Sequence, residues 1–118
     1  MTELVACLSS GKGSWNYILS LIREESWDNV FLITNEFGRE KFKTDKNVQF
    51  IVVNFEKPIF ELIKDIKNQL EGKIKGIEIA VNLISGDGKE HMAIMSAILK
   101  LGLAIRLVAL TESGVREV

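Results

Sequence analysis

The sequence predicts one α/β domain with a Rossmann-like, doubly wound and mainly parallel sheet of five strands, covered by helices on both faces. Short apolar runs alternate with amphipathic segments along the whole chain. Most of these runs are continuous, as in "VFLI" and "FIVV", which is typical of strands that are buried on both faces. No linker or repeat interrupts the sequence, so residues 1–118 are expected to form a single domain.

The elements are expected in the order strand, helix, strand, short helix, strand, helix, strand, helix, strand. The five strands are the apolar runs at about 3–8, 29–34, 48–54, 77–84 and 103–110. The first helix is expected after Ser14, because serine is a favourable N-cap residue. Its apolar face is made by Trp15, Ile18, Leu19 and Ile22. The short helix covers about 36–43.

The last two helices show clear ends or an unusual surface. Pro58 opens one helix at a position where its missing N–H costs nothing, and Gly72 ends it. The helix at about 90–102 has two apolar faces, one made by Met92, Met95, Ser96 and Leu99 and the other by Ile94, Ala97, Ile98 and Leu101. A chain of this size cannot wrap such a helix completely, so we expect a homodimer that forms through residues 90–102.

Composition excludes several classes of protein. The net charge is −1 with a pI near 5.9, whereas proteins that grip long nucleic acids are usually basic, so any nucleotide ligand should be small. One cysteine and one histidine make neither a disulfide nor a metal site, and no cofactor is expected. No apolar run approaches the ~20 residues that span a bilayer, and the N-terminus does not read as a signal peptide. We therefore expect a soluble cytoplasmic protein without membrane contact.

Two loops rich in serine, glycine and lysine each connect an expected strand to an expected helix. The first contains Ser9, Ser10, Gly11, Lys12, Gly13 and Ser14, and the second contains Ser85, Gly86, Asp87, Gly88 and Lys89. Small residues before a helix N-terminus let backbone N–H groups cradle a phosphate. The first loop is not a Walker A sequence, because Gly13 follows the lysine and no glycine stands five residues before Gly11.

Both loops are expected at the carboxyl ends of their strands, where open α/β sheets bind ligands. If the first and fourth strands are neighbours, the two loops line one site. The alternative is that the glycines serve only tight turns. Lys12 and Lys89 differ from ordinary surface lysines only in their place in glycine loops. His91, in the first turn of the last helix, is either structural or a donor and proton shuttle beside a phosphate.

Two families resemble parts of this sequence. The segment Ser9–Ser14 is similar to the strand–"SGGxDS"–helix start of the PP-loop ATPases over some 15 residues, with Gly13 in place of the aspartate. A wider resemblance is to the CARF domain, the CRISPR-associated Rossmann fold. The segments that carry it read "LVACLSSGKGSWNYILSLI", "WDNVFLITNEFGREKF" and "IAVNLISGDGKEHMAIMSAILKLGLAIRLVAL". Ser85–Lys89 followed by Met92 is similar to the family's "GGTK" segment with its Met-rich helix.

The CARF resemblance implies a ligand and an activity. In that family the loops after the first and fourth strands bind the ligand, and a chain ending at Val118 resembles the small CARF-only accessory proteins of type III CRISPR systems. Those proteins bind cyclic oligoadenylate, and several degrade it as ring nucleases. The expectation is therefore a cytoplasmic antiviral protein that binds cyclic tetra-adenylate. The alternatives are a binder or sensor without turnover and, more distantly, a PP-loop-like adenine-nucleotide protein.

Metal-independent cleavage to 2′,3′-cyclic phosphate ends is the expected reaction, because the sequence clusters no carboxylates or histidines for a metal. The resemblance implies that Ser10 or Ser9 contacts the reacting ribose or phosphate. Lys89 or Lys12 would stabilise charge on the phosphate. His91 is a further candidate base or acid, which the family pattern does not itself assign.

Overall fold

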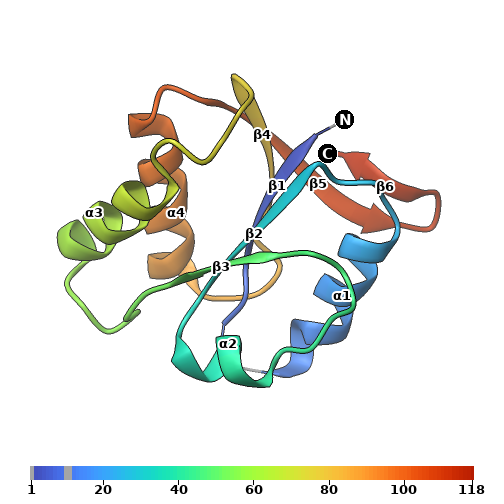
Figure 1. Ribbon diagram of the computed structural model, residues 1–118, viewed down its shortest axis with the longest axis horizontal. Coiled ribbons are helices and arrows are strands. Elements are labelled where there is room, and N and C mark those ends of the chain that lie inside the picture. Colours follow the sequence, from blue (N-terminus) through green and yellow to red (C-terminus); the bar gives the residue numbers. More distant parts are fainter. Residues whose placement is uncertain (1, 10–11) are drawn as a thin grey trace.

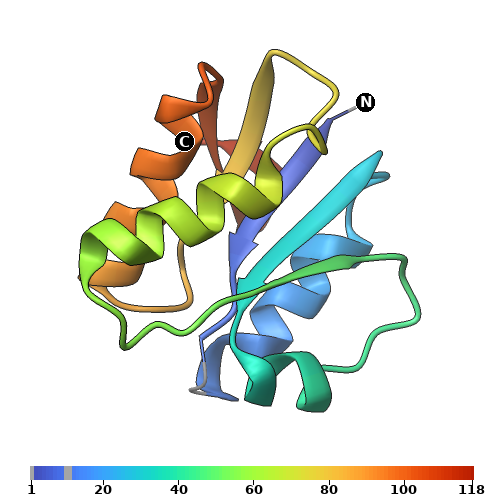
Figure 2. The same cartoon turned by 60° about the vertical axis from the view of Figure 1, so that its left-hand side comes forward.

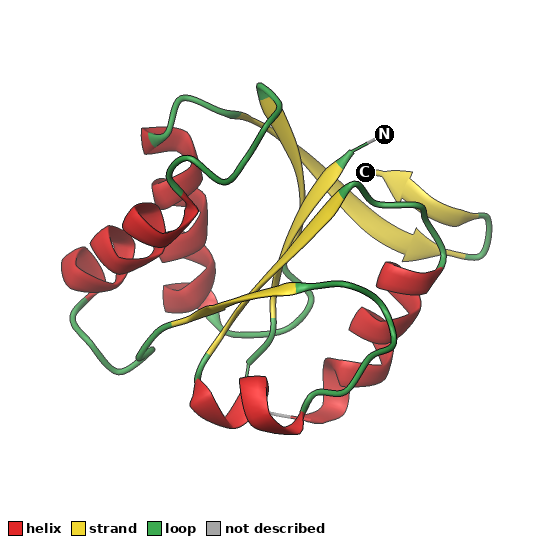
Figure 3. Ribbon diagram, in the orientation of Figure 1, coloured by secondary structure: helices red, strands yellow, loops and turns green. Residues whose placement is uncertain are grey.

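The computed structural model describes residues 2–9 and 12–118 and shows a sheet between two pairs of helices (Figures 1 and 3). The sheet has the order β3-β2-β1-β4-β5-β6. Its parallel strands are β1 (Glu3–Cys7), β2 (Asn29–Thr34), β3 (Gln49–Val52), β4 (Glu78–Asn82) and β5 (Ala104–Thr111), and β6 (Gly114–Glu117) is antiparallel to β5. The predicted Rossmann-like α/β fold class is confirmed in this coarse form.

Helices cover both faces of the sheet, as predicted. The chain forms α1 (Trp15–Arg23), after a 3₁₀ turn over Lys12–Ser14, and then α2 (Glu36–Lys41), α3 (Ile59–Leu70) and α4 (Gly88–Lys100). The pair α1 and α2 lies on one face, and the pair α3 and α4 lies on the other (Figures 1 and 2).

The continuous apolar runs have a direct explanation in β1. Its side chains alternate between the two faces, so Val5 and Cys7 pack in the core beneath α3 and α4, while Leu4 and Ala6 pack beneath α1. All four are fully buried. Each large apolar side chain buried in this way contributes about 1.5–3 kcal/mol. A polar side chain at any of these four positions would weaken the core on one face of the sheet. Both alternating sets of side chains are therefore apolar, and the run shows no alternation.

The order of the strands places β1 beside β4. Leu4 pairs with Ala80 and Val5 with Val81, in parallel register. The chain reverses its direction of winding between these two strands, and such switch points are where open α/β sheets bind ligands. The condition under which the two glycine loops share one site is therefore met.

The predicted count of five strands is wrong, because β6 adds a sixth. β5 turns through Glu112 and Ser113 into β6, and Gly114 adopts a φ of 95°, which favours glycine. The Thr111 hydroxyl accepts from the Ser113 N–H (3.1 Å) and donates to the Gly114 carbonyl (2.9 Å). As an edge strand with half of its residues exposed, β6 lacks the continuous apolar run by which the parallel strands are recognised.

The helix starts follow local chemistry. Pro58 directly precedes α3, which begins one residue later than predicted, and the Ser14 side chain makes no capping hydrogen bond to α1. Helix α4 begins at Gly88, two residues before the predicted start. Asp87 causes this earlier start, since its carboxylate accepts from the Glu90 N–H and the Glu90 carboxylate accepts from the Asp87 N–H.

The two apolar faces of α4 have different environments. Ile94, Ala97 and Ile98 are fully buried in the core that α4 shares with α3 and the sheet. Met92 and Leu99 on the other face are 65% and 59% exposed. The chain itself therefore covers one predicted face, and only the face of Met92, Met95, Ser96 and Leu99 is left for a partner.

Candidate functional site

The two glycine loops lie side by side at the carboxyl ends of β1 and β4. The backbone N–H of Ser9 donates to the hydroxyl oxygen of Ser85 over 2.9 Å, across 76 positions of sequence. Ser85 is only 2% exposed, so this hydrogen bond is shielded from water. We call Ser9–Ser14 and Ser85–Lys89 the loop pair, and it is the candidate site.

The first loop is held at its base from two directions. The Thr34 hydroxyl donates to the carbonyl of Leu8 over 2.6 Å, and the Trp15 indole N–H donates to the carbonyl of Ser9 over 2.8 Å. Ser10, Gly11 and the side chain of Lys12 were predicted to bind ligand, and they lie outside the described residues.

Gly86 occupies the tightest position in the second loop. Its φ is 105°, and a Cβ there would lie 2.7 Å from Cys7 Sγ, 2.7 Å from Glu90 Oε1 and 3.0 Å from His91 Nε2. Both the backbone conformation and the space require glycine. The interpretation of this loop as a turn that needs glycine, which the sequence left open, is therefore correct for Gly86.

Asp87 and Ser85 also have structural partners. The Asp87 carboxylate is used by the first turn of α4, and the Ser85 hydroxyl oxygen accepts from Ser9. His91 Nε2 lies 2.8 Å from the carbonyl of Ser85, which fits a proton on Nε2. These bonds fix the second loop in one shape, so that it presents its exposed residues, Gly86, Asp87, Gly88 and Lys89, on a rigid base.

Lys89 has its hydrogen-bond partner outside the loop pair. Its Nζ donates to the carbonyl of Phe55 over 2.9 Å, in the connection between β3 and α3. Met92, on the outward face of α4, is not brought into the loop pair. The structure thus brings together Ser9, Ser85, Gly86, Asp87 and His91, with Gly13, Ser14 and Gly88 in the same two loops.

Cys7 lies directly beneath the second loop, and sequence reasoning gave it no role. Its Sγ is fully buried, 4.0 Å from Glu90 Oε1. Burial, followed by the nearby carboxylates of Glu90 and Asp87, raises the pKa of the thiol well above its ordinary value. Cys7 is therefore a neutral packing group and not a nucleophile.

This thiol predicts a loss of stability at alkaline pH. The unfolded thiol releases its proton above its ordinary pKa of 9.0, whereas the folded one retains it, so the folded state binds more protons and becomes less stable as the pH rises. Between pH 8 and 10 the free energy of unfolding should fall by about 1 kcal/mol more in the wild type than in Cys7→Ala. Urea unfolding of both proteins measures this, and equal losses would contradict the assignment.

A groove of about 470 Å³ opens beside the loop pair, at the carboxyl ends of β2 and β3. Its lining includes Asn35, Asn54 and Phe55 on one side and Asp87, Lys89 and Glu90 on the other. We call it the amide groove. The sequence signal for it was an asparagine directly after the second strand and another two residues after the third, which is too common a feature of loops to single out.

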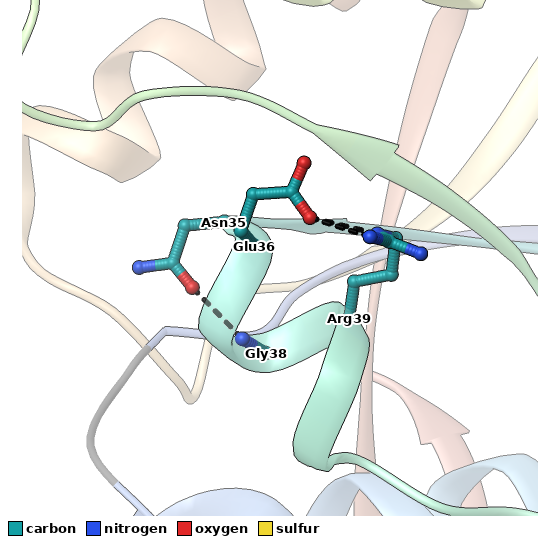
Figure 4. A network of polar contacts seen from close by, with 4 residues as sticks. All are labelled: Asn35, Glu36, Gly38 and Arg39. Atoms are coloured by element: carbon teal, nitrogen blue, oxygen red, sulfur yellow. Dashed lines mark hydrogen bonds and ion pairs between the residues drawn. The ribbon is translucent and has the colours of Figure 1, made fainter.

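Asn35 is held at the rim of this groove by helix α2. Its Oδ1 accepts from the N–H of Gly38 over 2.9 Å, which turns the amide nitrogen away from the helix (Figure 4). Glu36 and Arg39 form an exposed ion pair along the same short helix, and their hydrogen bond raises the pKa of the Arg39 guanidinium. The ion pair therefore lies on the solvent-exposed side of α2, whereas Asn35 lines the groove.

Two classes of site are not found in the described parts of the chain. Residues 2–9 and 12–118 contain no group of three or more His, Cys, Asp and Glu side chains placed to hold a metal ion. Within the same ranges, the longest helices fall short of the length and apolar character that crossing a membrane requires.

The description of the loop pair and the amide groove rests on the structure of this chain, without a related protein to compare. A scan against protein-family models and a search of curated proteins both return no match to this chain.

Proposed function

We propose that this protein binds a cyclic oligoadenylate, cyclic tetra-adenylate in the first instance, at the loop pair and cleaves it without a metal ion. The hydrogen bond between Ser9 and Ser85 carries the proposal, because it joins two glycine-containing loops at the switch point of the sheet. Such loops let the backbone approach a phosphate closely. The resemblance to CARF domains suggests that the ligand with these phosphates is a cyclic oligoadenylate.

The charge of the chain also supports a small ligand. The net charge is −1 over 118 residues, so the protein lacks the basic excess with which long nucleic acids are held. A gel-shift measurement at physiological salt should retain labelled cyclic tetra-adenylate and leave duplex DNA free. Equal retention of the two would contradict the proposed ligand class.

The outward face of α4 supports a homodimer in this proposal. Met92 and Leu99 are exposed, and a shallow hollow of about 430 Å³ lies over the same face. Exposed apolar side chains that gather in this way mark interaction sites. In an isologous dimer, two copies of the loop pair would surround one ring, which suits a ring with an even number of nucleotides.

Leu99→Glu should convert this dimer into a monomer, because it places an uncompensated charge in the contact. Phe60→Glu is the matched control, since Phe60 is 84% exposed on the neighbouring helix α3 and outside this face. Light scattering at micromolar concentration should give twice the chain mass of 13.3 kDa for the wild type and for Phe60→Glu. A wild-type mass near 13.3 kDa would contradict the dimer.

Cleavage in this proposal is an internal transfer within the ring. The ribose 2′-oxygen attacks the adjacent phosphorus, a P–O2′ bond forms and the P–O5′ bond breaks. The 2′-hydroxyl proton leaves to a base and the departing 5′-oxygen gains a proton, which gives a 2′,3′-cyclic phosphate and a 5′-hydroxyl. Ser10 or Ser9 would align the 2′-hydroxyl, Lys89 or Lys12 would stabilise the phosphate charge, and His91 is a candidate base.

One observation favours binding without turnover as the second candidate function. Ser85, Asp87 and His91 are all engaged in hydrogen bonds that shape the second loop. A loop that uses its polar groups in this way is suited to hold a ligand and leaves fewer groups to move a proton. Both functions need the same loop pair, and the appearance of linear product distinguishes them.

A further inference from the structure

The amide groove differs in chemistry from the loop pair. Three acidic residues line it, Glu56, Asp87 and Glu90, against one basic residue, Lys89. This balance disfavours a phosphate, because like charges repel. The groove therefore suits an uncharged part of a ligand whose phosphates lie elsewhere.

Two side-chain amides of the groove have fixed orientations. The Oδ1 atoms of Asn35 and Asn54 accept from the backbone N–H groups of Gly38 and Glu56, each over 2.9 Å. Among the described residues neither amide nitrogen has a hydrogen-bond partner. Each asparagine thus offers an NH₂ group as donor, and the carboxylates of the same groove offer acceptors.

Phe55 gives the groove an aromatic wall. Phe55 lines the groove and its partly buried side chain packs against the core, while its carbonyl accepts from Lys89 Nζ, so the residue is held at two points. Aromatic side chains of this kind stack on nucleobases with about 1–3 kcal/mol per base. The volume of about 470 Å³ falls within the range of small-molecule pockets.

We infer that the amide groove is a subsite for one purine base of the ligand. The inference rests on the proposed function and adds how the base is recognised. A purine such as adenine offers ring nitrogens that accept from the NH₂ groups of Asn35 and Asn54. Its exocyclic amino group donates to a carboxylate, and its ring stacks on Phe55. Lys89 belongs to both the loop pair and the groove, which makes the two continuous.

Asn35→Asp and Asn54→Asp test this directly. Aspartate keeps the oxygen that accepts from Gly38 or Glu56, so the cap and the turn are preserved, but it replaces the NH₂ donor by an acceptor. Asn68→Asp on the exposed side of α3 is the control with the same change of charge. Calorimetric titration with cyclic tetra-adenylate and with cyclic tetra-uridylate compares two rings that share a backbone and differ in their bases.

We expect the wild type and Asn68→Asp to bind the adenylate ring at least tenfold more tightly than the uridylate ring. Each of the other two variants should lose most of this preference. Equal binding of both rings by the wild type would overturn the purine subsite but not the proposed function. The same conclusion would follow if both variants kept the wild-type preference for the adenylate ring. No binding of either ring to the wild type would overturn the proposed function together with the subsite.

Discussion

Replacing Lys89 by alanine is expected to slow cleavage of cyclic tetra-adenylate by about two to three orders of magnitude, the effect of removing one donor that stabilises a transition state. In the structure Lys89 Nζ donates to the carbonyl of Phe55. The ammonium group must leave that carbonyl to reach the scissile phosphate. This exchange costs little, because the hydrogen bond is exposed and worth about 1 kcal/mol. Binding of the ring should weaken much less than cleavage.

Single-turnover kinetics on Lys89→Ala, Ser10→Ala and Lys64→Ala measure this effect. Ser10→Ala should resemble Lys89→Ala if its hydroxyl orients the 2′-hydroxyl of the ring. Lys64 is exposed on α3, and its substitution should change nothing. A wild-type rate in Lys89→Ala would remove Lys89 from the mechanism, and a parallel loss of binding and rate would make it a ligand clamp.

Gly86→Ala is expected to destabilise the fold by about 2–5 kcal/mol, since the strain of a positive φ adds to overpacking. The new methyl group would press on Cys7 Sγ and Glu90 Oε1, each 2.7 Å from the ideal Cβ position. The damage should spread to the loop pair, because the same loop contains Ser85, whose hydroxyl holds Ser9.

The control for this substitution lies two residues away. Gly88 begins α4, and a Cβ there would meet nothing within 4 Å. Gly88→Ala should therefore leave stability unchanged or raise it by about 0.4–1 kcal/mol through the unfolded state. Urea unfolding of the two variants measures both effects. Equal unfolding midpoints would contradict the requirement for glycine at position 86.

The sheet and its helices could be predicted because each has a strong local signal. The parallel strands are buried on both faces, which leaves continuous apolar runs in the sequence, and α1 and α3 each bury one stripe. β6 has no such signal, because an edge strand takes its place from pairing with β5. Its turn residues, Glu112 to Gly114, were the available clue.

Contacts between distant residues could not be predicted in the same way. Glu3 is the first residue of an otherwise apolar strand, and its carboxylate accepts from the backbone N–H groups of Lys75 and Gly76, each over 2.8 Å, and from the amide of Asn29 over 2.9 Å. This clamp ties the α3–β4 connection to β1. These contacts form only once the fold brings the α3–β4 connection next to β1. In the sequence alone, Glu3 is simply a charged residue at the end of a strand.

The candidate site shows the same division. Its two loops follow from composition, and their proximity follows from strand order. The amide groove was missed, because its residues come from three separate connections and each has a simple local role as a cap or turn. Conversely, Ser85 and Asp87 were predicted as ligand-binding residues, and their local roles became visible only in the structure.

Incubation of the wild-type protein with radiolabelled cyclic tetra-adenylate in EDTA tests the central claim most directly. The intact and linear products are separated on a denaturing gel, and retention of the ring is followed in parallel. We expect the ring to be retained and converted to linear fragments with 2′,3′-cyclic phosphate ends, without any metal ion. A retained ring that stays intact would make the protein a binder, and a ring that neither binds nor changes would contradict the proposed function.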